Sequence, residues 1–111
     1  MKVGRMSFAC CADNAGRRIF AIGGVTTGRK ATDICEMYNV DGAWVTLADL
    51  PEPRFSSSLC MFNDEWLYNF GGYDKNGVLT NTIERLNGQH QNGWETLTTR
   101  LPMKASFSGI F

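Results

Sequence analysis

The side chains that could bind a metal or form disulfides are four cysteines and one histidine: Cys10, Cys11, Cys35, Cys60 and His90. Adjacent cysteines on a strand point to opposite faces of a sheet. The chain has no C-x-x-C pair, and His90 falls in a segment rich in glycine and asparagine. A zinc site and a disulfide framework are both disfavoured. We expect reduced thiols, mostly buried as small apolar groups, with no metal and no cofactor.

The sequence contains no motif that is typical of an enzyme. A G-x-S-x-G nucleophile turn, an H-E-x-x-H helix and a G-x-x-x-x-G-K loop are all missing. The segment 23–30 resembles a phosphate-binding loop only superficially, and no helical pattern follows it. Glu36 and Glu84 recur 48 positions apart, which indicates the same structural part played twice and not a unique catalytic acid. We therefore expect a protein that is not an enzyme.

Length and charge exclude several classes of protein. The 111 residues are enough for about one domain. Eleven Lys and Arg balance eleven Asp and Glu, so no long-range field concentrates nucleic acid or a charged membrane surface. No apolar run is long enough for a membrane-spanning helix, and the N-terminus does not read as a signal peptide. We expect a soluble protein of the cytoplasm or the cytoskeleton.

The chain repeats itself with a period of about 50 residues. Gly23-Gly24 returns as Gly71-Gly72 at an offset of 48, and Trp44 returns as Trp94 at an offset of 50. The offset changes inside 87–93, and loops accept insertions that packed strands do not. The starts of the units align as Arg5-Met6-Ser7, Arg54-Phe55-Ser56 and Lys104-Ala105-Ser106. The sequence therefore predicts two structural units and the start of a third.

Each unit contains four short apolar segments separated by turn residues. Continuously apolar runs such as 19–22 are typical of a sheet that is covered on both faces. Asp41-Gly42 predicts a two-residue hairpin turn between the third and fourth segments. The predicted strands are 6–12, 18–23, 34–39 and 43–48 in the first unit, and 56–62, 66–71, 82–86 and 94–98 in the second. The predicted fold class is all-β, with each unit a four-stranded antiparallel meander.

These features resemble the kelch repeat, and the resemblance covers nearly the whole chain. The first unit has the double glycine Gly23-Gly24 after its second strand, and Tyr38 stands six positions before Trp44. A proline-containing loop, 50–53, leads into Arg54. The second unit keeps the double glycine and the tryptophan but has Leu86 in place of the tyrosine. In the family each repeat is one blade of a β-propeller of about four to eight blades.

The resemblance implies an incomplete propeller. Two units are fewer than a closed ring needs, so missing sequence or other chains would supply the remaining blades. Three chains of two blades each could build a ring of six. The expected boundaries are a partial propeller over 1–111, with a first blade at 5–53, a second at 54–103 and the first strand of a third at 104–111.

The function that the resemblance implies is a non-catalytic scaffold for protein–protein interaction. In the family, the loops after the second strands surround one mouth of the ring, and the arginine that starts each blade can hold acidic peptide groups. Ubiquitin ligase adaptors, cytoskeletal binders and components of large assemblies use this fold. The alternative is a fragment of a kelch-type enzyme, oxidase-like, whose catalytic residues lie in blades outside these residues. The expected partner-binding residues are Arg5, Arg29, Lys30, Arg54, Tyr73, Asp74 and Lys104.

Two further expectations concern single side chains. If Arg54 lies on the surface, its replacement by alanine weakens partner binding and lowers stability by no more than about 0.5 kcal/mol. Trp44 and Trp94 are expected to pack neighbouring sheets together, because a tryptophan brings a large apolar surface to such a contact. The alanine variant of Trp44 should then cost about 3 to 5 kcal/mol.

Overall fold

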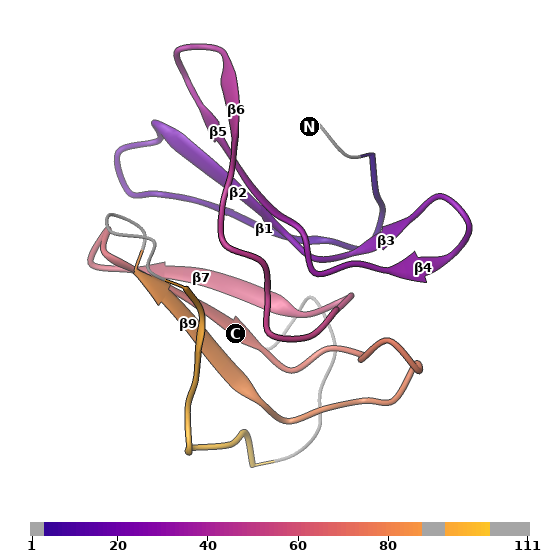
Figure 1. Ribbon diagram of the computed structural model, residues 1–111. Coiled ribbons are helices and arrows are strands. Elements are labelled where there is room, and N and C mark those ends of the chain that lie inside the picture. The colour runs from indigo at the N-terminus through magenta and orange to yellow at the C-terminus, as the bar shows by residue number, and fades with distance from the viewer. Residues whose placement is uncertain (1–3, 88–92, 103–111) are drawn as a thin grey trace.

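The computed structural model describes residues 4–87 and 93–102, and these residues form strands and loops without a helix. Two four-stranded antiparallel sheets lie one on the other (Figure 1). The all-β class is therefore confirmed. The first sheet has the order β1-β2-β5-β6 and consists of β1 (Ala9–Ala12), β2 (Arg18–Ile22), β5 (Cys35–Asn39) and β6 (Ala43–Thr46). The second has the order β10-β9-β8-β7 and consists of β7 (Ser58–Phe62), β8 (Trp66–Phe70), β9 (Ile83–Asn87) and β10 (Glu95–Thr96).

All eight predicted segments overlap these strands, with ends that differ by up to three residues, and both sheets are meanders in which consecutive segments pair. The turn at Asp41-Gly42 differs in one detail. Asn39 pairs with Ala43, so the loop has three residues where two were predicted. Gly42 has a φ of 98°, and its N–H donates to the Asn39 carbonyl at 2.8 Å. A three-residue loop with a left-handed residue is the next commonest hairpin after the two-residue one.

A third, two-stranded sheet was not predicted. It consists of β3 (Val25–Thr26) and β4 (Lys30–Ala31) and extends the loop after β2 as a ribbon. Strands of two residues are too short to show a periodic pattern. Two hydrogen bonds hold the ribbon at its base, from the Met6 N–H to the Val25 carbonyl at 2.9 Å and from the Val25 N–H to the Met6 carbonyl at 2.8 Å. The ribbon is thereby tied to the start of the first unit.

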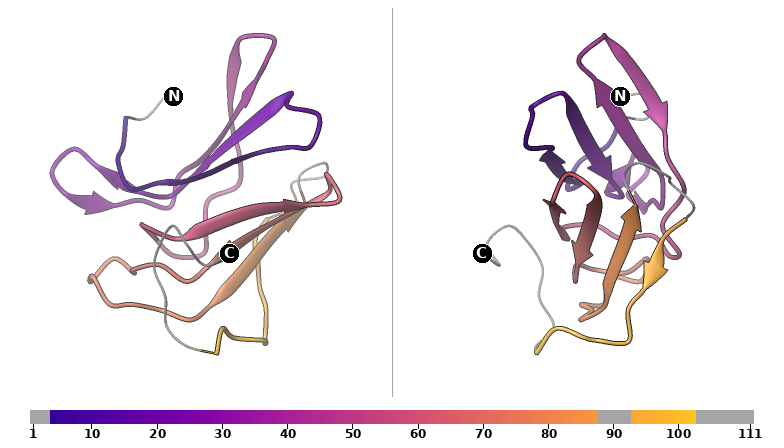
Figure 2. Two further views of the ribbon diagram at one scale, coloured as in Figure 1. Left: turned by 180° about the vertical axis from the view of Figure 1, so that it is seen from behind. Right: turned by 90° about the vertical axis from the view of Figure 1, so that its left-hand side faces the viewer.

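The core lies between the two large sheets (Figure 2). Phe20 and Ile22 of the first sheet are fully buried there, and so are Leu67 and Leu86 of the second. Trp94 packs against this cluster, and its indole Nε1 donates to the Ala48 carbonyl of the first unit at 3.0 Å. Trp94 therefore joins the two sheets as predicted.

Trp44 has different surroundings from Trp94. Its ring lies 5.2 Å from the ring of Tyr38, measured between centroids, within its own sheet. Trp44 does not belong to the cluster between the sheets. Among the described residues, Trp94 lies between the sheets and Trp44 does not. The large loss of stability that was expected for the alanine variant of Trp44 therefore applies better to that of Trp94.

The four cysteines are free, as expected, but they are not mostly buried. Cys35 is buried in the core, Cys11 and Cys60 are half-buried, and Cys10 is exposed. Cys10 and Cys11 point to opposite faces of β1, so only one of the pair can reach the core. Burial raises the pKa of Cys35 and of Cys11 to about 12, which keeps both as thiols at neutral pH.

The double glycine lets the chain pass closely from one sheet to the next. Gly23 has a φ of 63°, and a Cβ added to it would collide with the Arg54 carbonyl oxygen. The N–H of Gly24 donates to that same oxygen at 2.7 Å. A side chain at Gly23 would separate the connection from the end of β2, and one at Gly24 would collide with the Met6 carbonyl oxygen and with Phe8. Gly23 is therefore required by the junction between the two units, and Gly24 by the passage of the segment that enters the first unit.

We predict that Gly23→Ala costs clearly more stability than Gly28→Ala. Gly28 also has a positive φ, 89°, but its added Cβ meets no atom within 4 Å. Gly28→Ala should cost about 1 to 2 kcal/mol for the left-handed backbone alone. Gly23→Ala adds a backbone collision and should exceed about 3 kcal/mol. Urea unfolding of both variants checks this, and equal costs would contradict the close passage.

Candidate functional site

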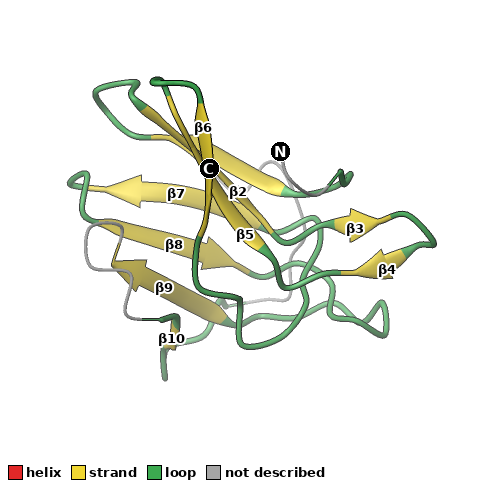
Figure 3. Cartoon of the chain, turned by 45° about the horizontal axis from the view of Figure 1, so that its top comes forward, coloured by secondary structure: helices red, strands yellow, loops and turns green. Residues whose placement is uncertain are grey.

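The loops after the second strands of both units project from the same side of the molecule (Figures 1 and 3). One is the β3–β4 ribbon and the other is the loop 73–80. The β1–β2 turn lies at the opposite end of the first sheet (Figure 1). We call the side with the two loops the loop face. It carries four of the seven expected partner-binding residues: Arg29, Lys30, Tyr73 and Asp74.

The ribbon presents two cations to solvent. Arg29 and Lys30 are exposed at its tip. Gly28 and Arg29 both have positive φ, and the Arg29 N–H donates to the Thr26 carbonyl at 3.1 Å. The Thr26 hydroxyl closes the turn from the other side by donating to the Lys30 carbonyl at 3.3 Å. Two hydrogen bonds therefore fix this turn, and they leave the two charged side chains exposed.

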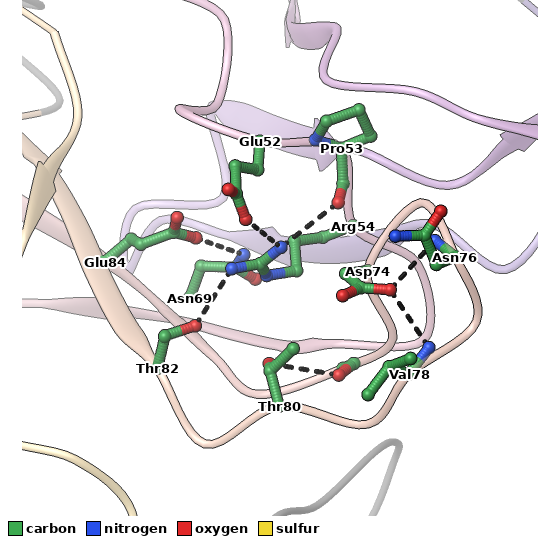
Figure 4. A network of polar contacts seen from close by, with 11 residues as sticks. Glu52, Pro53, Arg54, Asn69, Asp74, Asn76, Val78, Thr80, Thr82 and Glu84 are labelled. Carbon is green, nitrogen blue, oxygen red and sulfur yellow. Dashed lines mark hydrogen bonds and ion pairs between the residues drawn. The ribbon is translucent and has the colours of Figure 1, made fainter.

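The loop of the second unit is organised by its own aspartate. Asp74 Oδ1 accepts two hydrogen bonds, one from the Asn76 N–H at 2.8 Å and one from the Val78 N–H at 3.0 Å (Figure 4). The Val78 hydrogen bond is the main reason that the pKa of Asp74 lies below its usual value of 3.8. Tyr73 stacks on Phe55 with ring centroids 5.1 Å apart. Asp74 and Tyr73 thus shape this loop before any partner arrives.

Arg5, which begins the first unit, is turned into the protein. Its side chain has no exposed surface and forms an ion pair with the buried carboxylate of Glu36. Its Nη1 donates to the Gly23 carbonyl at 2.9 Å and also to the Ile34 carbonyl. Arg5 therefore fastens the start of the unit to the ends of β2 and β5. A cavity of about 460 Å³ is lined both by Arg5 and by Arg29 of the ribbon.

Arg54 holds the equivalent place in the second unit and is only 3% exposed. Its Nη1 donates to Glu52 Oε2 and to the Pro53 carbonyl, both at 3.2 Å, and its Nη2 donates to Thr82 Oγ1 at 3.2 Å (Figure 4). The expectation that Arg54 is a surface residue is wrong, because its guanidinium group binds within the chain. Binding of a partner by Arg5 or Arg54 stays a prediction, and Lys104 lies outside the described residues, as does His90.

Glu84 is a buried carboxylate in the place that Glu36 occupies in the first unit. It is 2% exposed, and Asn69 Nδ2 donates to its Oε1 at 3.3 Å. Asn69 pairs directly across from Glu84, whereas Ala21 pairs across from Glu36. Burial raises the pKa of Glu84, and the charge of Arg54 offsets this only in part. The two glutamates share a position, as their recurrence predicted, but their hydrogen-bond donors differ.

The sequence analysis missed the residues that complete this network, Asn69 and Thr82. Asn69 gave a signal, because it is the one polar amide within the apolar run of β8. Its place directly across from a glutamate becomes visible only with the register of the strands. Thr82 gave no such signal, because a threonine is common at the start of a strand. Both follow from tertiary pairing and not from local pattern.

Two general properties of the described residues bear on chemistry. Within 4–87 and 93–102, no group of three or more His, Cys, Asp and Glu side chains is placed to hold a metal ion. The same residues include no helix long and apolar enough to cross a membrane.

In comparisons with known proteins, no family model matches the chain and no curated protein matches it.

We predict that Arg54→Ala destabilises the protein by about 3 kcal/mol. The change removes three hydrogen bonds and leaves the Glu84 carboxylate buried without its nearby positive charge. Lys75→Ala, an exposed change in the adjacent loop, should stay within about 0.5 kcal/mol. Chemical unfolding measures both. If the two variants are equally stable, the buried role of Arg54 is refuted.

We also predict that the wild type loses stability as pH rises above the usual pKa of a glutamate, and that Glu84→Gln does not show this loss. Because the folded pKa is raised, the unfolded carboxyl ionises first above its usual value of 4.5. The free energy of unfolding then falls until the folded carboxyl ionises too. Glu84→Gln should therefore gain stability relative to wild type between pH 4.5 and pH 7.

Glu36→Gln is the matched control for Glu84→Gln. It deprives the buried Arg5 guanidinium of its ion-pair partner and should cost about 3 to 5 kcal/mol at pH 7. Unfolding free energies measured across the pH range separate the two glutamates. Parallel pH curves for wild type and Glu84→Gln would show that Glu84 titrates alike in both states.

Proposed function

We propose that the chain is a non-catalytic scaffold for protein–protein interaction and a segment of a kelch-type β-propeller. In this proposal the loop face binds partners, and further blades come from missing sequence or from other chains. The observation that carries the proposal is the equivalence of the two sheets in space. Each is a four-stranded meander, and both send the loop after the second strand to the same side (Figure 1).

Backbone conformation supports the repeat independently of sequence pattern. Ser7 and Ser56, which follow the arginines that begin the two units, both have a φ of 55°. Gly23 and Gly71 have φ values of 63° and 61°. Positive φ is uncommon for serine, so its recurrence at equivalent positions favours one motif built twice. A repeated sheet with variable loops at one end is a common architecture for recognition.

The partner that best suits the loop face is a protein segment rich in acidic residues. Arg29 and Lys30 are exposed together on a ribbon whose turn is held by two hydrogen bonds. Arg5 and Arg54 support the loops from within, in place of direct contact with solvent. Asp74 Oδ1 accepts two N–H groups of its own loop, which keeps the carboxylate ionised, so the ribbon and not the loop 73–80 is the part of the loop face that suits an acidic partner. Arginine can hold a carboxylate with two parallel hydrogen bonds.

The test uses a fluorescent peptide of alternating glutamate and glycine, with binding followed by anisotropy. We predict that the Arg29→Ala, Lys30→Ala double variant weakens binding about tenfold, since two exposed ion pairs are lost. Arg17→Ala is the control, because Arg17 is equally exposed but lies in the β1–β2 turn. Binding should also weaken with added salt.

Two results would contradict the proposed loop face. One is equal loss of binding in the double variant and in Arg17→Ala, which would mean that any surface cation attracts the peptide. The other is that the wild type binds a matched lysine–glycine peptide but does not bind the glutamate–glycine peptide. Both variants change exposed side chains, so circular dichroism should report an unchanged fold.

A further inference from the structure

The arginine that begins the first unit binds the strand ends of its own sheet. Arg5 Nη2 forms the ion pair with Glu36. Its Nη1 donates to the Gly23 carbonyl at 2.9 Å and to the Ile34 carbonyl. The Ile34 carbonyl also accepts the Gly23 N–H at 3.0 Å, so both of its lone pairs are used. These contacts hold the guanidinium group between the end of β2 and the start of β5.

The second unit contains the same acceptors, but its arginine binds elsewhere. The Gly71 N–H donates to the Thr82 carbonyl at 2.9 Å, which repeats the backbone geometry of the first unit. Arg54 makes three hydrogen bonds, each of 3.2 Å, to the connection that precedes it and to Thr82 Oγ1 (Figure 4). At the offset of 48, the acceptors that correspond to those of the first unit are the carbonyls of Gly71 and Thr82 and the carboxyl group of Glu84.

Two polar side chains distinguish the second unit from the first at this junction. Asn69 and Thr82 stand where the first unit has Ala21 and Ile34. The asparagine supplies the amide that binds the glutamate, and the threonine supplies the hydroxyl that binds the arginine. The second unit therefore offers both charged residues a neutral partner that the first unit lacks.

The amide of Asn69 is only half used. Its Nδ2 donates to Glu84 Oε1 at 3.3 Å, whereas its Oδ1 is buried and has no hydrogen-bond partner among the described residues. A buried acceptor without a donor is costly. An ionised Glu84 cannot satisfy it, because a carboxylate only accepts hydrogen bonds. A protonated Glu84 has one donor and one acceptor, and these complement the two groups of the amide.

The charges that face Glu84 belong to the connection between the units. Burial raises the pKa of Glu84, the charge of Arg54 lowers it, and the charge of Glu52 raises it. Directly across from it, β8 and β10 place an amide and a hydroxyl group, neither of them charged. The first sheet contributes apolar side chains and the Cys35 thiol to the interface, and the raised pKa of that thiol keeps it neutral. The protonation state of Glu84 is therefore coupled to the arginine and to Glu52.

We propose that Arg54 exchanges partners when Glu84 changes its protonation state. With Glu84 protonated, the acid pairs with both groups of the Asn69 amide, and Arg54 keeps its bonds to Glu52 and Thr82. When Glu84 loses its proton to solvent, Arg54 turns to the carboxylate and binds as its counterpart binds in the first unit. The first unit has neither the amide nor the hydroxyl, so it is fixed in this second arrangement.

The two arrangements are close in free energy, as a switch requires. The arginine makes three hydrogen bonds in each. One of the bonds that it gives up is to Glu52, whose side chain is 67% exposed, and such ion pairs contribute little. The buried ion pair that it gains offsets the desolvation of the ionised carboxylate. Ser7 and Ser56, which follow the two arginines, both have a φ of 55°, so the two side chains start from similar backbone.

The exchange takes place at the base of the loop 73–80. Phe55 follows Arg54, and it exchanges backbone hydrogen bonds of 3.1 and 2.9 Å with Tyr73 and stacks on its ring. Release of Glu52 frees the connection just before this pair. The switch therefore links the protonation of Glu84 to the support of this loop, whether or not the loop face binds an acidic partner.

The test titrates the wild-type chain by NMR, with ¹³C-labelled glutamate carboxyl groups and the Nε–H signal of Arg54. Glu84→Gln assigns the Glu84 signal. The signals of Arg54 and Glu52 should change with the apparent pKa of Glu84. Crystal structures at about pH 4 and about pH 9 should show Arg54 on Thr82 and on Glu84, respectively. These wild-type measurements decide the question even where a variant is unstable.

Asn69→Ala restores the alanine of the first unit and tests the sign of the effect. It should lower the pKa of Glu84 by about 1 or more, since the protonated acid loses its acceptor and the carboxylate gains the arginine. If Asn69 serves only as a donor to the carboxylate, the same change raises that pKa. The double variant Asn69→Ala, Thr82→Ile should hold Arg54 on Glu84 at neutral pH. Asn76→Ala is the control, because Asn76 is an exposed asparagine of the loop 73–80 and its loss should leave the pKa of Glu84 unchanged.

Three results would overturn the switch. The first is a pKa of Glu84 that rises in Asn69→Ala. The second is a wild-type structure in which Arg54 keeps its bond to Thr82 although Glu84 is ionised. The third is a folded double variant in which Arg54 does not bind Glu84 at neutral pH. None of these measurements uses a peptide, so failure of the proposed loop face and failure of the switch are distinguished.

Discussion

Each four-stranded sheet of this protein carries apolar side chains on both faces, and only stacking against another sheet removes both from water. The first sheet buries Phe20 on one face and displays Ile19 on the other. The second buries Leu67 and leaves Phe62 at the edge of a groove. Sheets packed face to face gain their stability from this contact. The core between the sheets, the contact of Trp94 with the first unit and the close approach of Gly23 to Arg54 all depend on this stacking.

The polar groups at the junctions show how one position can be satisfied in two ways. In the first unit Arg5 meets Glu36 directly, and its Nη1 donates to the Gly23 and Ile34 carbonyls. In the second unit Asn69 stands where Ala21 stands in the first, and its amide binds Glu84 instead. A buried carboxylate that binds a neutral amide is stabilised less than one that binds a guanidinium group. Burial raises the pKa of Glu84, and the charge of Arg54 and the Asn69 hydrogen bond offset this only in part.

The strands and their order could be predicted from the sequence, because apolar runs and turn residues are local signals. The site could be predicted only in part. Arg54 reads as a surface residue, since an arginine beside prolines in a loop is usually solvated; its burial depends on Thr82, which lies 28 residues away in the chain. The exposed thiol of Cys10 depends on which face of β1 meets the second sheet. Such features follow from packing between elements, which no local pattern encodes.

The β3–β4 ribbon and the contact between the two sheets use different surfaces of this fold. The β3–β4 ribbon projects from the ends of the strands, whereas the faces of the sheets lie across the strands (Figure 3). Gly28 meets no neighbouring atom within 4 Å where a Cβ would be added, and Arg29 and Lys30 contribute nothing to the core. Changes in the ribbon therefore leave the stacking contacts intact. Arg5 is buried beside the base of the ribbon by its contacts with Glu36 and with the Gly23 and Ile34 carbonyls, so the first unit itself holds the ribbon in place.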